Sequence, residues 1–135
     1  MREIKKEGRT LARLIQPEDI KAGLNFFSED SEYIQVGVWG HYEKGKELAA
    51  HIHNPVERVA LRTCEVLYII SGRIEATIYD LDENYVEKVM VNAGEILVLL
   101  ESGHGYRILE EDTTVLEVKN GPYLGAEKDR YRLEG

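Results

Sequence analysis

Two of the four histidines in the sequence, His51 and His53, are separated by a single residue within an apolar run. Side chains at positions i and i+2 of a β-strand point to the same face and stand roughly 7 Å apart at their bases. Two imidazoles at this spacing can bind one ion, with metal–nitrogen distances of about 2.0–2.1 Å for zinc. The pair therefore indicates a metal site, and the alternative is a polar patch at the mouth of a sheet.

Two further residues can complete such a site. Glu65 opens the next strongly apolar run, where it shares a strand face with Leu67 and Ile69. His104 opens a later β-type run. Taken singly, a glutamate at the start of a strand is usually solvated and a strand histidine is usually structural, so the hypothesis depends on the combination. If these strands are neighbours, one barrel mouth would hold four ligands: His51, His53, Glu65 and His104.

The elements that would position these residues are short β-type runs separated by turn residues, without the βαβ alternation of nucleotide-binding folds. One helical turn is expected after Pro17, a favourable first helical residue that acids follow. The run 95–100 is apolar on both faces, which predicts a strand covered on both sides. The pattern predicts an all-β sandwich or barrel in a single domain, residues 1–135. The predicted strands cover residues 10–15, 32–42, 47–54, 63–72, 73–80, 85–91, 95–100, 104–109 and 113–119.

The spacing around the histidines resembles the first motif of the cupin superfamily, which is Gly, five residues, His-x-His, a short gap, Glu, six residues and Gly. Gly45 precedes His51 by five intervening residues, and Glu65 precedes Gly72 by six. The gap between His53 and Glu65 is eleven residues, where the family has three or four. This departure is interpreted as a lengthened hairpin loop.

The second cupin motif is matched in outline by the segment that starts at Gly94 and places His104 in the position of the last ligand. Leu100 stands where the family usually has Pro, the turn is one residue shorter, and the expected Asn is not there. The resemblance covers roughly residues 37–119.

This resemblance implies a double-stranded β-helix, that is a jelly-roll barrel, with its core at about residues 32–119. It implies a divalent transition-metal ion (Fe, Mn, Ni, Co or Zn) held by three histidines and one glutamate, namely His51, His53, Glu65 and His104. An open coordination position would permit Lewis-acid chemistry or oxygen activation on a small polar, sugar-like molecule. Tyr106 and His41 are the candidate proton carriers.

Isomerisation, epimerisation and oxidation all stay open as reactions. A non-catalytic cupin that senses or stores a ligand, with or without metal, is the alternative. The run 116–125 is loosely similar to small cupins associated with polysaccharide and nucleotide-sugar genes.

The composition restricts the partners. Acidic residues outnumber Lys and Arg by 25 to 17, a formal charge of −8, which argues against nucleic acid and anionic membranes. Cys64 is the single cysteine, and its strand parity opposes that of Glu65, so it is interpreted as a buried packing thiol.

The expected location and assembly follow from the same features. With one cysteine, no signal peptide and no transmembrane segment in the sequence, we expect a reducing, cytoplasmic location. Apolar strands with free edges predict a homodimer, because such edges can pair. A purely structural β-sandwich subunit is the remaining alternative.

Overall fold

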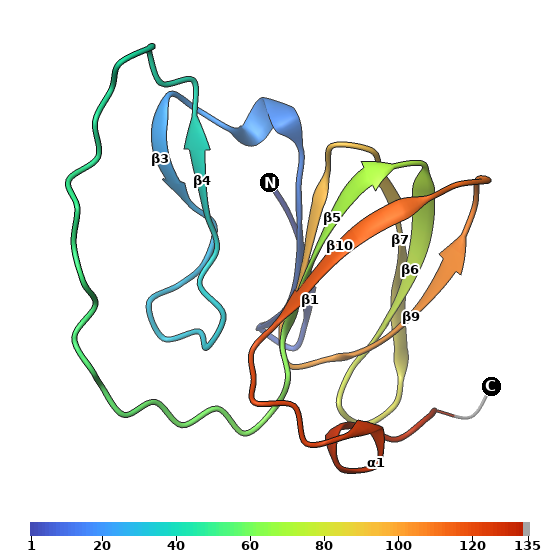
Figure 1. Ribbon diagram of the computed structural model, residues 1–135. Coiled ribbons are helices and arrows are strands. Elements are labelled where there is room, and N and C mark those ends of the chain that lie inside the picture. Colours follow the sequence, from blue (N-terminus) through green and yellow to red (C-terminus); the bar gives the residue numbers. More distant parts are fainter. Residues whose placement is uncertain (134–135) are drawn as a thin grey trace.

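Three antiparallel sheets make up most of the computed structural model, which describes residues 1–133 (Figure 1). The strands are β1 (Arg2–Lys6), β2 (Arg9–Ile15), β3 (Gly23–Phe26), β4 (Gly37–Gly40), β5 (Glu65–Ser71), β6 (Arg73–Tyr79), β7 (Tyr85–Asn92), β8 (Ile96–Leu99), β9 (Gly103–Ile108) and β10 (Thr114–Lys119). The largest sheet has the order β1-β2-β8-β5-β10, another has the order β7-β6-β9, and β3 pairs with β4 as a hairpin. Within the described residues no sheet closes on itself, so the all-β prediction is confirmed at the level of antiparallel sheets.

Helical structure is confined to two short segments of the described chain. The predicted turn is present as η1 (Pro17–Asp19), a 3-10 turn in which the Gln16 amide donates to the Asp19 carboxylate at 2.8 Å. A second turn, α1 (Ala126–Asp129), lies near the C-terminal end. In residues 1–133 we find no helix with the length and apolar character that crossing a bilayer requires.

The five-stranded sheet is the middle of three layers. Between it and the β7-β6-β9 sheet lies one core, which includes Leu67, Leu97 and Leu99 from the larger sheet and Ile74 and Val91 from the smaller one. These side chains are buried because alternate residues of each strand turn toward the facing sheet.

A second core lies on the opposite face of the five-stranded sheet. Val98 and Leu100 pack there with Ile34 and Val36 from the hairpin layer. The alternation of Leu97 and Leu99 with Val98 and Leu100 confirms that the 95–100 run is covered on both sides. We call residues 23–40 the hairpin layer, which consists of β3, β4 and the loop that joins them.

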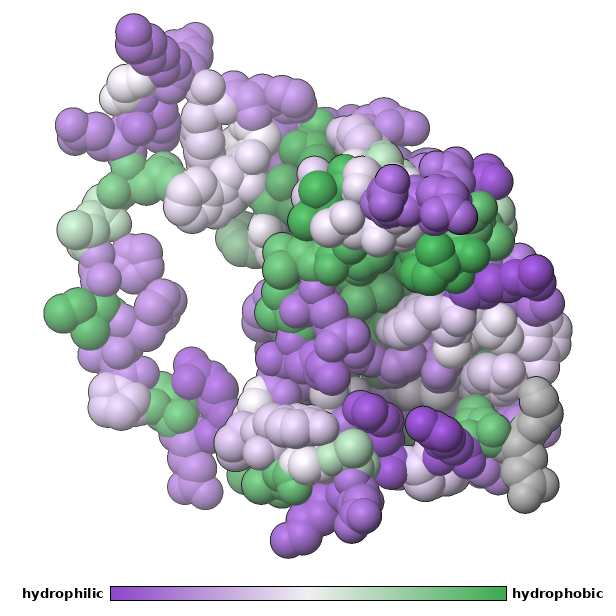
Figure 2. Space-filling model, turned by 45° about the vertical axis from the view of Figure 1, so that its right-hand side comes forward, coloured by the Kyte–Doolittle hydropathy of each residue, from purple (hydrophilic) through white to green (hydrophobic). Residues whose placement is uncertain are grey.

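The segment between β4 and β5 departs from the prediction. A strand was expected at residues 47–54, but residues 46–61 have no assigned strand, helix or turn, and residues 41–62 are exposed. We call residues 47–61 the arm. Figure 1 shows it arching away from the sheets, and Figure 2 shows an opening between it and the body. A strand needs a neighbour for its backbone hydrogen bonds, and in this conformation the arm has none among the described residues.

The strand expected over residues 32–42 is also shorter than predicted, because only Gly37–Gly40 pairs, with β3. The N-terminal strand β1 was not predicted, since its charged residues hide the inward-facing Ile4, which is 1% exposed. Cys64 is buried in the second core, which confirms its reading as a packing thiol.

Candidate functional site

Glu65 and His104 meet at one end of the space between the two larger sheets. Glu65 is the first residue of β5, and its side chain faces the same core as Leu67 because the two are separated by one residue. His104 is the second residue of β9, in the sheet opposite. The Nε2 atom of His104 donates a hydrogen bond to the Oε2 atom of Glu65. The structure therefore brings these two predicted ligands together from facing sheets.

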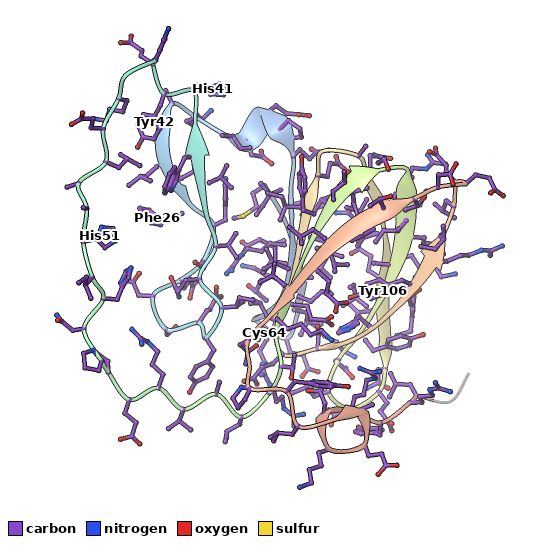
Figure 3. The ribbon with its side chains drawn as sticks, viewed as in Figure 1. Phe26, His41, Tyr42, His51, Cys64 and Tyr106 are labelled. Atoms are coloured by element: carbon purple, nitrogen blue, oxygen red, sulfur yellow. The ribbon has the colours of Figure 1, made fainter. Side chains whose placement is uncertain are left out.

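Tyr106 belongs to the same cluster. It lies two residues after His104 on β9, and the two rings stack with centroids 5.2 Å apart and planes at 29°. This is the arrangement that their shared strand parity predicts. Figure 3 shows Tyr106 on the body of the protein, beside the strands that face each other.

Strand β10 adds two residues that the sequence analysis missed. In the register of β10 with β5, Lys119 lies opposite Glu65, and Glu117 lies opposite Leu67. The Lys119 Nζ atom is 3.1 Å from the Glu117 Oε1 atom. No local signal could have found them, because their place beside Glu65 depends on the pairing of β10 with β5. We call Glu65, His104, Tyr106, Glu117 and Lys119 the mouth cluster.

The pKa values of Glu65 and Tyr106 in the mouth cluster shift in opposite directions. Burial by itself raises the pKa of Glu65, which is only 5% exposed, but the hydrogen bond and charge of His104 outweigh burial and hold that pKa below its ordinary value. Burial raises the pKa of Tyr106 well above its ordinary value, and the Glu65 and Glu117 carboxylates add to the effect. Glu65 is therefore an ionised acceptor at neutral pH, and Tyr106 keeps its hydroxyl proton.

One buried atom in the cluster lacks a partner. The Nδ1 atom of His104 is buried and has no hydrogen-bond partner in the described part of the chain. A buried ring nitrogen without a partner carries a free-energy cost, so it is a position where a bound group could supply the missing interaction.

The other pair of predicted ligands lies on the arm. The rings of His51 and His53 are 4.9 Å apart at their centroids, and His51 Nδ1 is 3.0 Å from the Ala49 carbonyl oxygen. Both side chains are exposed. Figure 3 shows His51 across the opening from the body that carries Tyr106. The two histidines thus lie beside each other, as their spacing predicts, but they lie away from Glu65.

The structure agrees with the metal prediction only in part. Glu65 and His104 have the donor types that the predicted ion needs, but in residues 1–133 no group of three or more His, Cys, Asp and Glu side chains is placed to hold a metal ion. In this conformation the four predicted ligands form two separate pairs, so the full set does not fit one ion. The four-ligand site stays a prediction.

His41, the other candidate proton carrier, is not part of the mouth cluster. It follows β4 with a left-handed φ of 53° and is exposed. Figure 3 shows it beside Tyr42 at the tip of the hairpin layer, on the side of the molecule away from Tyr106. The structure therefore gives it no contact with Glu65 or His104.

Comparison of the chain with family models, with curated proteins and with solved structures finds no match.

Proposed function

We propose that this protein is a small cupin-like protein that binds a divalent transition-metal ion and a small polar molecule at the mouth cluster. The observation that carries the proposal is the meeting of Glu65 and His104, which stand in the two separate cupin-like motifs of the sequence. The ion would be held by these two residues together with His51 and His53. Fe, Mn, Ni, Co and Zn all suit imidazole and carboxylate ligands.

The proposed barrel is a jelly roll. A jelly roll has eight strands in two facing sheets. The β7-β6-β9 sheet has one strand fewer than a four-stranded half, and among the described residues β9 pairs with β6 alone. The arm contains the strand expected at 47–54, so its docking on the free edge of β9 would supply the fourth strand and carry both arm histidines toward Glu65.

The polar groups of the mouth cluster favour a hydroxyl-rich or carbonyl-bearing small molecule. Ionised Glu65 accepts hydrogen bonds, while protonated Tyr106 and Lys119 donate them. A sugar-like molecule needs both kinds of partner. A proton donor beside a proton acceptor is also what an isomerisation or epimerisation requires, so these reactions are proposed ahead of oxidation.

A metal-free ligand-binding protein is the second candidate. The contact between Glu65 and His104 favours it, because the carboxylate and the imidazole are already hydrogen-bonded to each other without an ion. Elemental analysis decides between the two candidates.

The test is the metal content of protein purified without added metal and after dialysis against Mn²⁺ or Co²⁺. The wild type is expected to hold about one ion per chain. The His51→Ala/His53→Ala variant and the Glu65→Gln variant are expected to lose it, whereas the matched control His41→Ala retains it. Full metal content in the double variant would remove the ligand assignment. A metal-free wild type would leave the second candidate.

A further inference from the structure

We propose that residues 121–133 form a lid over the mouth cluster, hinged at Asn120 and latched by Asp129, and that release of the latch admits the small molecule. We call residues 121–133 the strap. Its role as a gate rests on the proposed function, because that function places a ligand at the mouth cluster. The closure of the strap depends only on its contacts with the body, whether or not a ligand binds.

The strap crosses the end of the body at which the mouth cluster lies. It comes shortly after β10, and it contains the short helix α1. In Figure 1, α1 lies beyond the end of the body at which β5 begins and β10 ends. Glu65 is the first residue of β5 and Lys119 is the last residue of β10, so the strap starts beside the cluster.

The hinge is fixed to the chain just before Glu65. The Oδ1 atom of Asn120 accepts a hydrogen bond from the Cys64 amide at 2.7 Å, and its Nδ2 atom donates to the Arg62 carbonyl oxygen at 3.3 Å. Because both polar atoms of this side chain have partners in the body, we expect Asn120 to stay in place when the strap moves.

The latch is a hydrogen bond between the strap and the body. The Thr63 hydroxyl donates to the Asp129 carboxylate at 2.5 Å. The other residues of α1, 126–128, are exposed, whereas the Asp129 side chain is only 19% exposed. A hydrogen bond to a charged acceptor is stronger than one between neutral groups, so this contact is well suited to hold the strap closed.

The strap also reaches the second sheet. A Cβ added at Gly103 would lie 3.3 Å from the Leu133 Cδ1 atom, so Leu133 packs directly on the backbone of Gly103. Gly103 immediately precedes His104 on β9. In the larger sheet, the latch residue Thr63 lies two residues before Glu65. The strap is therefore attached close to each partner of the contact between the two sheets.

One strap residue lies against the mouth cluster itself. The Lys119 Nζ atom is 5.9 Å from the centroid of the Tyr123 ring, a cation–π distance. Lys119 is also the residue that lies opposite Glu65 in the register of β10 with β5. An open strap would remove the aromatic ring from Lys119 and leave more of its ammonium group free to donate to a ligand.

The strap is held more weakly than the core. Tyr123, Leu124 and Tyr131 are 66%, 68% and 71% exposed. Segments with few buried apolar contacts open at a lower free-energy cost than the core of the same protein. The strap can therefore open while the two sheets stay folded, which is what a gate requires.

His104 can report whether the strap is open. Its Nε2 atom donates to Glu65 and its Nδ1 atom is buried, so both ring nitrogens are shielded in the closed form. Diethyl pyrocarbonate acylates the unprotonated ring nitrogens of accessible histidines. His41, His51 and His53 are exposed in the same chain and serve as internal references.

The experiment measures the labelling rate of His104 by mass spectrometry, without added metal, in the wild type and in two variants. Thr63→Val removes the donor of the latch, and Asp129→Ala removes its acceptor. Each is expected to raise the ratio of His104 to His41 labelling by about tenfold or more, because the latch is a hydrogen bond to a charged group. The double variant is expected to label no faster than the faster single variant, because both changes remove the same bond. The control Glu127→Ala, at an exposed position of α1, leaves the ratio unchanged.

The amides of Leu67 and Ile69 in the core are expected to exchange at the wild-type rate in all variants, which shows that the sheets stay folded. An unchanged labelling ratio in both single variants overturns the gate. So does a ratio that rises only together with core exchange, or a wild type in which His104 labels as fast as His41. Since the labelling needs no metal, a metal-free wild type with a responsive strap overturns the metal-binding proposal alone.

Discussion

The buried arginine Arg13 offers the sharpest test of how the hairpin layer is held. Its side chain is 2% exposed on β2, at the face that the hairpin layer covers. Its Nη1 and Nη2 atoms lie 2.6 and 2.8 Å from the two Glu32 carboxylate oxygens. Nη1 also donates to the Phe27 carbonyl oxygen at 3.2 Å, and Nε donates to Glu3 at 3.1 Å. One side chain thus joins the central sheet to the loop between β3 and β4.

The substitution Arg13→Met keeps most of the apolar stem and removes the guanidinium. It leaves the largely buried Glu32 carboxylate without its cation and the Phe27 carbonyl without its donor. Breaking a buried ion pair by removing one partner costs about 3–5 kcal/mol. For a chain of this length, we expect the free energy of unfolding to fall by that amount and the melting temperature to fall by about 10–20 °C.

The assay is urea denaturation followed by circular dichroism, with Arg9→Met as the matched control. Arg9 lies on the same strand and reaches Glu101 at 3.2 Å, but that pair is exposed, so its loss should cost less than about 1 kcal/mol. The variant Arg13→Met/Glu32→Leu should recover most of the stability, because it removes both charges. If Arg13→Met unfolds within about 1 kcal/mol of the wild type, the ion pair is not what holds the hairpin layer.

Three further predictions concern the turn after β5, acid stability and the thiol. Gly72→Ala should lower the free energy of unfolding in urea by about 2–4 kcal/mol, because φ is +81° and an added Cβ would lie 2.7 Å from the Thr113 Cα atom. The control Gly105→Ala has open space for a Cβ and should change that free energy by less than about 1 kcal/mol. Equal costs for the two substitutions would refute this. The folded protein lowers the pKa values of Glu32 and Glu65, so the stability that they contribute is present above their ordinary pKa of 4.5 and is lost as the pH falls through their pKa values in the folded state. Thermal melts between pH 7 and pH 3 should show this loss of stability, and the loss should be smaller in the Glu32→Gln variant. Burial raises the pKa of the Cys64 thiol, so a disulfide reagent should react slowly in buffer and quickly in urea, and fast labelling of the native protein would contradict its burial.

Strands whose partners are close in the sequence or whose apolar faces are regular were predictable. The hairpin of β6 and β7 and the doubly covered β8 were both expected from the sequence, because period-two alternation and continuous apolar runs are local signals. The facing of Glu65 toward the same core as Leu67 follows from strand parity in the same way.

Features that need a distant partner were not predictable. The burial of Arg13 depends on Glu32, which the fold brings from another layer. Glu117 and Lys119 become part of the candidate site only because β10 pairs with β5. The segment 47–54 has the pattern of a strand, yet a strand forms only where a neighbouring backbone accepts its hydrogen bonds.

The same distinction between local and long-range features applies to the candidate site. Residue types and spacing were enough to single out His51, His53, Glu65 and His104, because ligand chemistry and side-chain parity are properties of short stretches of chain. Which of them share a space depends on long-range packing, and the fold joins Glu65 to His104 while the arm carries the other two away from the body. Coordination requires donors within about 2 Å of one ion, and only contacts between distant segments, or between chains, can bring them to that distance.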